Sequence, residues 1–367
     1  MASKCLLKGG TIATCVQGST TPQVYKADVL IEGNAITRIA EDISPQAGVE
    51  VIDCTDKWIT PGFVDTHRHL FMTVLRGNQC DWLLSEYMVK MAWYDALWRG
   101  TMEMHKEFLA YARSIPVSII TAHIVKGPQI LQWRDGGILG ADVVFSHCNV
   151  LADRPALDDE MWAALKESGA AIASTPEDEL GMAHGNPVAL DALQRGVKCG
   201  LGVDATSINS GDIFTQMRFA LQWARGHDHE RIHLNKETPP FHNKYSSADA
   251  FRLGTLGGAE ALGLSNLIGT VEVGKRADLV VFDASSVNLA GAADPITGVV
   301  FHAASEDVET VFVDGEIVKR GGKLVHEWAP VARELKKRAD EVRERWPEDK
   351  LEERWQKWYD TNGAPIF

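Results

Sequence analysis

Two histidines, His67 and His69, lie one residue apart at the end of the apolar segment ITPGFVDTHRH. In a β-strand, side chains two residues apart point to the same face, so both imidazoles would be directed at one point. Two imidazoles directed at one point are what two neighbouring ligands of a metal ion require. The segment therefore predicts part of a metal site, provided that the rest of the chain supplies further ligands.

Other polar side chains stand directly after apolar segments further along the chain. They are His123 in VSIITAHI, His147 in DVVFSHC and Asp204 in GLGVDATS. Because the carboxyl ends of parallel strands meet at one edge of a sheet, we expect these side chains to lie close to the two histidines. Imidazole and carboxylate ligands suit one divalent ion, with Zn²⁺ expected first and Fe²⁺ or Mn²⁺ as alternatives.

Each of these residues alone also has an ordinary structural explanation. A histidine at a strand end is often a satisfied core residue, and Asp204 before ATSINSGD has the position of a helix cap. Unrelated core histidines, however, would not all be found at strand ends. The ordered set predicts a catalytic metal site, which leaves one coordination position for a water molecule.

The elements around these residues indicate an α/β fold. Residues 59–264 alternate apolar strand segments with helical segments, which is typical of a parallel sheet and, in a chain of this size, of a TIM-type (β/α) barrel. Residues 1–58 and 265–325 contain short alternating runs broken by Gly, Asn and Pro, and we expect them to form one small discontinuous β-sandwich domain. Residues 326–367 are charged and Trp-containing, and predict a C-terminal helical segment.

Charge and composition exclude some classes of partner. The 367-residue chain has a formal net charge of −13, which argues against nucleic acid or an anionic membrane surface as a partner. Its six cysteines form no C-x-x-C pair, which favours reduced thiols inside a cell. No signal peptide and no apolar run of about 18 residues is found, so we expect a cytoplasmic protein without a membrane span.

Several of these segments together resemble the amidohydrolase superfamily, in the branch of cytosine deaminase, the chlorohydrolases and the methylthioadenosine/adenosylhomocysteine deaminases. The segments are ITPGFVDTHRH, SHCNVL, GVKCGLGVDATS, TLGGAEALGL and IGTVEVGKRADLVVFD. The resemblance implies a (β/α)₈ barrel with a discontinuous β-sandwich, one divalent metal ion and hydrolysis of carbon–nitrogen or related bonds. Relatives of this kind are commonly dimers or larger, which makes a homodimer a further expectation.

The resemblance also assigns roles to the residues identified above. By position, His67 and His69 match the ligands of barrel strand 1, His123 the ligand of strand 5 and Asp204 the residue of strand 8. Asp204 would bind the metal ion and also accept a proton from the attacking water. His147 matches the strand-6 histidine that orients the substrate and stabilises developing charge. The substrate implied is a small, cyclic molecule.

One departure concerns proton transfer. Deaminases of this branch carry a Glu three residues after the strand-5 histidine, where this chain has Lys126. A lysine is a poor carrier of that proton unless its pKa is strongly lowered. Glu177 and Glu179 in STPEDELGMAHGNP are candidate substitutes, although a solvated acidic loop explains them equally well, and His184 in the same loop is a candidate substrate contact.

The second departure is the length of the chain between the first and the second group of ligands. About 30 residues per βα unit would place strand 5 about 120 residues after strand 1. His69 and His123 are only 54 residues apart, and the intervening Met- and Trp-rich segment is typical of helix. We therefore expect an incomplete barrel that lacks about two βα units or all of strands 2 to 4. A second metal ion is not expected, because strand 4 supplies its bridging lysine in binuclear relatives.

Three functions follow from these features. The first is a metal-dependent hydrolase that acts on non-peptide carbon–nitrogen bonds of a small cyclic substrate through a metal-activated water. The second is an aminohydrolase of a nucleobase-like or nucleoside-like ring, against which Lys126 counts. The third is a truncated, non-catalytic relative that binds a metal ion or a ligand, which the short interval between His69 and His123 keeps open.

Overall fold

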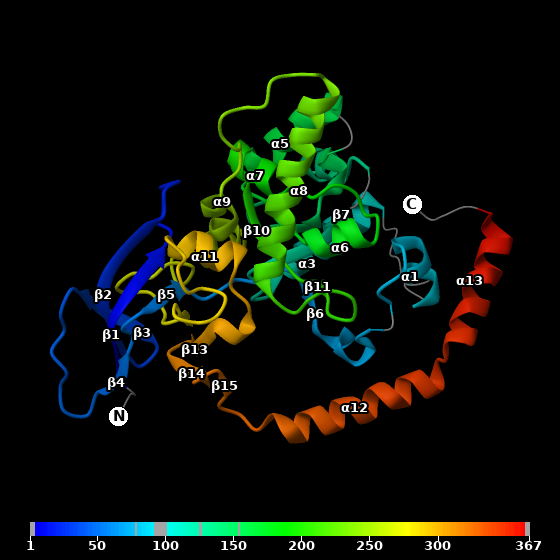
Figure 1. Ribbon diagram of the computed structural model, residues 1–367. Helices are drawn as coiled ribbons and strands as arrows, with labels where there is room; N and C mark the ends of the chain where they lie inside the picture. Colours follow the sequence, from blue (N-terminus) through cyan, green and yellow to red (C-terminus); the bar gives the residue numbers. More distant parts are fainter. Residues whose placement is uncertain (1–3, 78, 92–100, 125–126, 153–154, 364–367) are drawn as a thin grey trace.

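The computed structural model describes residues 4–77, 79–91, 101–124, 127–152 and 155–363 (Figure 1). Lys126, the residue at the position of the expected proton shuttle, lies outside these ranges. Two groups of strands form the framework, a mixed sheet built from both ends of the chain and a parallel sheet from its middle.

The mixed sheet joins the N-terminal and C-terminal parts of the chain. Its strands follow the order β15-β14-β13-β12-β5-β1-β2-β3, and β4 pairs with β1. The junction is the antiparallel pair of β5 and β12, in which Trp58 is paired with Phe282. The strands are β1 (Lys4–Thr14), β2 (Gln23–Glu32), β3 (Ala35–Ala40), β4 (Glu50–Asp53), β5 (Lys57–Pro61), β12 (Leu279–Asp283), β13 (Val308–Val313), β14 (Glu316–Arg320) and β15 (Lys323–Leu324). The division of the chain into domains at residues 58, 265 and 325 stays a prediction.

β-Branched and aliphatic residues explain why the mixed sheet forms. One buried cluster on it contains Val29 and Ile31 of β2 and Leu279 and Val281 of β12, at alternating positions in each strand. Alternation places these side chains on one face, where each is almost completely excluded from solvent. The face is continuous across strands that lie about 250 residues apart in sequence.

The parallel strands position the candidate site. Four of them pair in the order β10-β9-β8-β7, and a short parallel pair of β6 and β11 lies next to β10. The connection is direct, because the backbone N–H of Thr66 donates to Leu201 O at the end of β10, at 3.0 Å. The strands are β6 (Arg68–His69), β7 (Ile120–Ile124), β8 (Val143–His147), β9 (Ala171–Ser174), β10 (Lys198–Leu201) and β11 (Asp204–Ala205).

The described part of the segment between His69 and Ile120 contains helices and turns but no strand. A 3-10 turn over Leu70–Leu75 follows β6, and then come α1 (Leu84–Lys90) and α3 (Met102–Ser114). β6 stands at the position of barrel strand 1 and β11 at that of strand 8, and the two lie side by side, as in a barrel. On the opposite side, between β6 and β7, the described residues form no strand. The α/β fold with a separate sheet is confirmed, and the arrangement agrees with an incomplete barrel.

Helices cover the outside of the parallel strands (Figure 1). The longest is α8, whose first turn is capped by the Asp212 carboxylate, which accepts from Thr215 N at 2.8 Å. Besides α1 and α3, the α-helices are α4 (Gln129–Asp135), α5 (Pro155–Ser168), α6 (Pro176–Gly181), α7 (Ala189–Arg195), α8 (Ile213–Leu234), α9 (Ser247–Arg252), α10 (Gly258–Ala261), α11 (Pro295–Phe301), α12 (Trp328–Arg345) and α13 (Glu348–Asn362). Within the described ranges, no helix has the length and the apolar character that crossing a membrane demands.

The two C-terminal helices, α12 and α13, extend from the mixed sheet along the lower and right-hand side of the molecule (Figure 1). They end beside α1, where the Lys90 ammonium lies 2.6 Å from Glu352 Oε2 of α13 and 2.8 Å from Glu86 Oε1. The Lys90 side chain is almost completely buried and lies over the Trp82 ring. The C-terminal helices are thus attached to the segment that follows β6.

Candidate metal centre

Four predicted ligands come together around β6, the carboxyl end of β7 and the first residue of β11. The Nε2 atoms of His67 and His123 lie 3.2 Å apart. Asp204 Oδ1 lies 3.2 Å from His69 Nε2 and 3.6 Å from His67 Nε2. Ligand atoms of His67, His69 and His123 all lie within 4.8 Å of one another. The site therefore connects β6 and β7 across the side on which the described residues form no strand.

The spacing of these atoms fits a divalent metal ion. Two Zn–N bonds of about 2.05 Å at a tetrahedral angle would place their nitrogens about 3.3 Å apart. The separation of 3.2 Å between the Nε2 atoms of His67 and His123 agrees with this value. Two unprotonated ring nitrogens that face each other repel, so a cation or a proton between them is required. The donor set of imidazoles and one carboxylate could hold such an ion.

Backbone interactions fix β6 and β11 against each other. Asp65 Oδ1 accepts hydrogen bonds from the backbone N–H groups of His67 and Val203, at 3.3 and 3.2 Å. Gly202 permits the close approach, because a Cβ there would lie 2.7 Å from His67 O. Asp204 has a φ of 63°, a left-handed conformation that costs a non-glycine residue about 1–3 kcal/mol. Strain of this kind persists where the surrounding structure holds it in place.

His147 lies next to the four ligands and is buried. Its Nε2 is 3.4 Å from Asp204 Oδ2, and its Nδ1 is 3.0 Å from Thr175 Oγ1. Its φ of 73° is also left-handed, so two residues of the site carry backbone strain. His147 forms a second possible metal-binding group with His67 and Asp204. The hydroxyl of Ser146, the preceding residue, lies 3.1 Å from His67 Nδ1 and orients that ring.

The surroundings lower the pKa of three imidazoles of the site, those of His69, His123 and His147. Desolvation by the surrounding protein and the neighbouring His67 lower the pKa of His123 to about 4, even though part of its side chain reaches the surface. Burial lowers the pKa of His69 and, more strongly, that of His147. Burial alone would raise the pKa of Asp204, but the hydrogen bond with His67 and the adjacent imidazoles lower it. Neutral imidazoles and a carboxylate are the forms that bind metal ions.

Glu177 and Glu179, the candidate substitutes for the missing Glu, both bond to groups of the protein. Glu177 Oε2 accepts from Ser210 N, Ser210 Oγ and Gln216 Nε2, which joins α6 to the loop after β11. Glu179 is completely buried, and it accepts from Thr175 N at 2.8 Å and from Ser174 Oγ. Burial raises the pKa of Glu179 to about 8.

His184 lies against the site from the same loop. Its ring is perpendicular to that of His147, with the ring centroids 4.7 Å apart. Neither ring nitrogen has a hydrogen-bond partner, although His184 is buried and its Nε2 lies 3.3 Å from Asp178 Oδ2. Burial lowers the pKa of His184 to about 4. A buried imidazole with unsatisfied nitrogens beside His147 is suited to bind a polar group.

Sequence reasoning missed the residues that hold the site in place. Asp178 is buried, and its Oδ1 accepts from Asn209 Nδ2 at 2.7 Å. Burial and the negative charge of Asp204 raise the pKa of Asp178. The sequence did contain a signal for Asp178, because it lies between Glu177 and Glu179 in PEDE, a loop with three acidic residues directly after a strand. Ser146 and Thr175 gave no comparable signal.

An α/β fold that gathers histidines and an aspartate at the ends of its parallel strands is typical of metal-dependent hydrolases. This chain belongs to the amidohydrolase family, whose profile matches residues 113–318. That match contains His123, His147 and Asp204. His67 and His69 precede it, and the structure brings them to the same point.

Curated relatives are deaminases of adenosine-type compounds. A 5-methylthioadenosine/S-adenosylhomocysteine deaminase of Acetivibrio thermocellus is 29% identical over 189 residues, which are 51% of this chain and 40% of the relative. A 5'-deoxyadenosine deaminase of Methanothermobacter thermautotrophicus is 24% identical over 409 residues, covering 82% of this chain and 91% of the relative. The first match thus spans less than half the length of its relative.

Similar solved structures confirm the fold. A mutant of the atrazine chlorohydrolase TrzN from Arthrobacter aurescens TC1, complexed with zinc and atraton, has a TM-score of 0.75 at 16% identity. The similarity covers 91% of this chain and all of that chain. An adenosine deaminase from Xanthomonas campestris with bound zinc has a TM-score of 0.70 at 16% identity, and covers 93% of this chain and 99% of that one.

Proposed function

We propose that this protein is a metal-dependent hydrolase that cleaves carbon–nitrogen bonds of a small, cyclic substrate by means of a metal-activated water. The observation that carries the proposal is the convergence of His67, His69, His123 and Asp204, with Nε2 atoms of two imidazoles 3.2 Å apart. Membership of the amidohydrolase family supports it. The zinc named with the similar TrzN structure supports Zn²⁺ as the ion, with Fe²⁺ or Mn²⁺ as alternatives.

The metal ion would be held by His67, His69, His123 and Asp204. When bound, a divalent ion of this type lowers the pKa of a coordinated water toward 7 and polarises the bond to be cleaved. Ser146 holds the His67 ring in the orientation that directs Nε2 to the site. One ion is proposed, in keeping with the absence of a strand-4 lysine from the described residues between β6 and β7.

The proton of the attacking water would be taken up by Asp204. From Asp204 Oδ2 it can pass to His147 Nε2, which lies 3.4 Å away. His147 is in turn held by Thr175 through its other ring nitrogen, at 3.0 Å. A protonated His147 can then stabilise charge on the substrate or deliver the proton to the leaving nitrogen. This route does not need the glutamate that Lys126 replaces.

Substrate recognition is proposed for the loop that follows β9. If His184 directs its Nε2–H toward Asp178, its Nδ1 keeps a lone pair and can accept a hydrogen bond from an N–H group of the substrate. Amino-substituted heterocycles and cyclic amides present such groups. Glu177 and Glu179 would act by positioning this loop, because their oxygens are bonded to groups of the protein.

A deaminase acting on a nucleobase-like or nucleoside-like ring is the second candidate. The names of the curated relatives favour it, since they are deaminases of adenosine-type compounds. Lys126 in place of the expected glutamate counts against it. A homodimer and a cytoplasmic location remain expectations from the sequence.

The test is metal content and turnover on the purified full chain beside a His123→Ala variant. The parent is expected to hold Zn²⁺ at the centre and to lose it in the variant. It should also hydrolyse at least one compound from a panel of cyclic amides, aminated heterocycles and chlorinated triazines. Ammonia release from the amino compounds would favour the deaminase, while ring opening would favour amide hydrolysis. A folded parent with no bound metal after growth in zinc would leave only the non-catalytic, truncated relative.

A further inference from the structure

The C-terminal end of α8 carries a second group of histidines that the metal centre does not use. The sequence there is HERIH, so that His229 and His233 lie four residues apart around Glu230. This is the H-E-x-x-H pattern, in which the two histidines share one face of a helix and can bind the same ion. Residues four apart on a helix have Cβ atoms about 5–6 Å apart, within reach of one metal ion.

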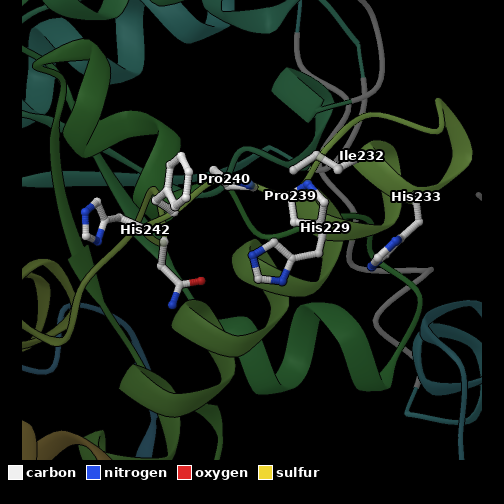
Figure 2. A pocket seen from close by; sticks show the side chains of 8 residues that line it. His229, Ile232, His233, Pro239, Pro240 and His242 are labelled. Carbon is white, nitrogen blue, oxygen red and sulfur yellow. The ribbon is translucent and has the colours of Figure 1, made fainter.

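A cavity of about 220 Å³ lies at this end of the helix. His229 and His233 line one side of it, and His242 with the Pro239–Pro240 pair lines the loop side (Figure 2). In the described part of the chain, none of these three imidazoles takes part in a hydrogen bond or an ion pair. A cavity bordered by three imidazoles without partners provides ligands for a soft or borderline metal ion.

We propose that His229 and His233 bind a divalent transition-metal ion such as Zn²⁺, with His242 as the third protein ligand. The lining of the cavity contains no carboxylate, which excludes a site built for Ca²⁺ or Mg²⁺. The ion would join the end of α8 to the loop formed by residues 235–244. In the structure the ligand atoms of His229, His233 and His242 do not lie within 4.8 Å of one another, and the His242 ring points away from His229 (Figure 2). Because His242 is exposed, its ring can turn toward the helix when the ion binds.

The far end of the loop is already fixed, which keeps His242 near the helix. Tyr245 is buried, its carbonyl oxygen accepts from Arg225 Nη2 of α8 at 2.8 Å, and its hydroxyl donates to Asp191 Oδ1. His242 is three residues from this anchor. Binding an ion would therefore order a short stretch of chain rather than recruit a distant one.

This second site is separate from the metal centre and has another role. α8 rises about 33 Å over its 22 residues, and β6 and β11 lie near its first turn (Figure 1). Glu230 is exposed and does not line the cavity, so the site lacks a base that could activate water. The ion would stabilise the helix end and its loop without hydrolysing a substrate.

The experiment is Zn²⁺ titration of the full chain, followed by equilibrium dialysis and elemental analysis. The parent is expected to bind one Zn²⁺ more than the double variant His229→Ala/His233→Ala. His227→Ala is the matched control, because His227 stacks on Trp223 on the same helix and does not line the cavity. That control should retain the second ion, and His123→Ala should retain it as well.

Proteolysis supplies the second measurement. Zn²⁺ should slow cleavage within residues 235–244 in the parent and in His227→Ala, but not in the double variant. The proposal is overturned if the parent binds no ion beyond that of the metal centre. It is equally overturned if the folded double variant still binds the additional ion.

Discussion

At the scale of single residues, the pairing of His184 with Asp178 decides how the proposed site recognises its substrate. Asn209 Nδ2 donates to Asp178 Oδ1, which leaves Oδ2 to face His184 Nε2 at 3.3 Å. In the proposed site, a shift of His184 that lets Nε2–H donate to Asp178 would leave Nδ1 for the substrate. This pair lies outside the set of metal ligands, so changes here should separate binding from chemistry.

Asp178→Asn is expected to raise KM about tenfold, the equivalent of one weakened hydrogen bond of about 1.4 kcal/mol, with a smaller effect on kcat. The amide removes the acceptor that orients His184, while the metal ligands keep their positions. Steady-state kinetics together with metal content would check this. A variant that loses its metal ion, or that lowers kcat with KM unchanged, would show that Asp178 acts on the metal centre instead.

The type and order of the residues that meet at the candidate site could be predicted from the sequence, because each stands directly after an apolar segment. The contacts that support them could not. Ser146, Thr175 and Asp65 are common residue types, and their importance depends on which loop folds over which strand end. For Glu177 and Glu179, the sequence showed acidic side chains near the site, but not that Ser210 and Thr175 bond to them.

At the scale of elements, the segment just before β6 closely approaches the residue that follows β10. A Cβ on Gly202 would meet His67 O, N and Cβ at 2.7 to 2.9 Å. All of these are atoms at or next to the backbone of His67, one of the proposed metal ligands, and none can rotate away. Gly202→Ala should therefore move His67, lower the metal affinity and destabilise the protein by about 1–3 kcal/mol.

Gly226→Ala is the matched control for this substitution. Gly226 lies in the interior of α8, and a Cβ there would meet nothing within 4 Å. Alanine is the better helix former, so this variant should gain about 0.5–1 kcal/mol and keep its metal ion. Chemical unfolding and metal analysis of both variants provide the comparison. Unchanged metal binding in Gly202→Ala would contradict the role given to this contact.

A second prediction concerns Asp28 of β2, which is buried in the mixed sheet. It accepts from Lys8 Nζ, Gly9 N and Ile43 N, each at 2.7 Å. Burial alone would raise the pKa of Asp28, but these donors lower it below its usual value. Asp28→Asn should cost about 2–4 kcal/mol at pH 7, because one acceptor oxygen becomes a donor that faces other donors.

The pH dependence of this loss has a defined sign. The stability that ionised Asp28 contributes is complete above its unfolded pKa of 3.8 and is lost as the pH falls through the lower pKa of the folded state. The difference between parent and variant should therefore be constant near neutral pH and decrease below about pH 4. Asp42→Asn is the control: Asp42 also pairs with Lys8 but is 80% exposed, and should change stability by less than about 1 kcal/mol.

At the scale of the whole molecule, the sequence predicted the α/β class and the return of the C-terminal strands to the N-terminal sheet. It also predicted an incomplete barrel, because 54 residues cannot contain three βα units and their connections, and the described residues between β6 and β7 form no strand. The sequence could not show what lies beside the remaining strands. α1 and the Leu70–Leu75 turn follow β6, and the C-terminal helices pack against them, contacts that no local pattern encodes.

The last prediction tests whether these helices support the shortened part of the fold. Lys90 is almost completely buried at this junction, between Glu86 of its own helix and Glu352 of α13. Lys90→Met keeps the aliphatic length over the Trp82 ring but removes the charge. Both carboxylates can turn to solvent, so the expected loss is about 1–2 kcal/mol, smaller than for a fully buried pair.

Loss of the Lys90 charge should loosen α13 before it destabilises the core, because Lys90 links that helix to α1. Limited proteolysis should release residues 348–362 faster in Lys90→Met than in the parent, and added salt should accelerate the release from the parent. Lys336→Met is the control, because Lys336 pairs with Asp340 on the exposed face of α12. Leu84 N donates to Met182 O near the loop of His184, so a loosened α1 should also weaken substrate binding. Equal cleavage rates in parent and Lys90→Met would mean that apolar packing alone holds the C-terminal helices in place.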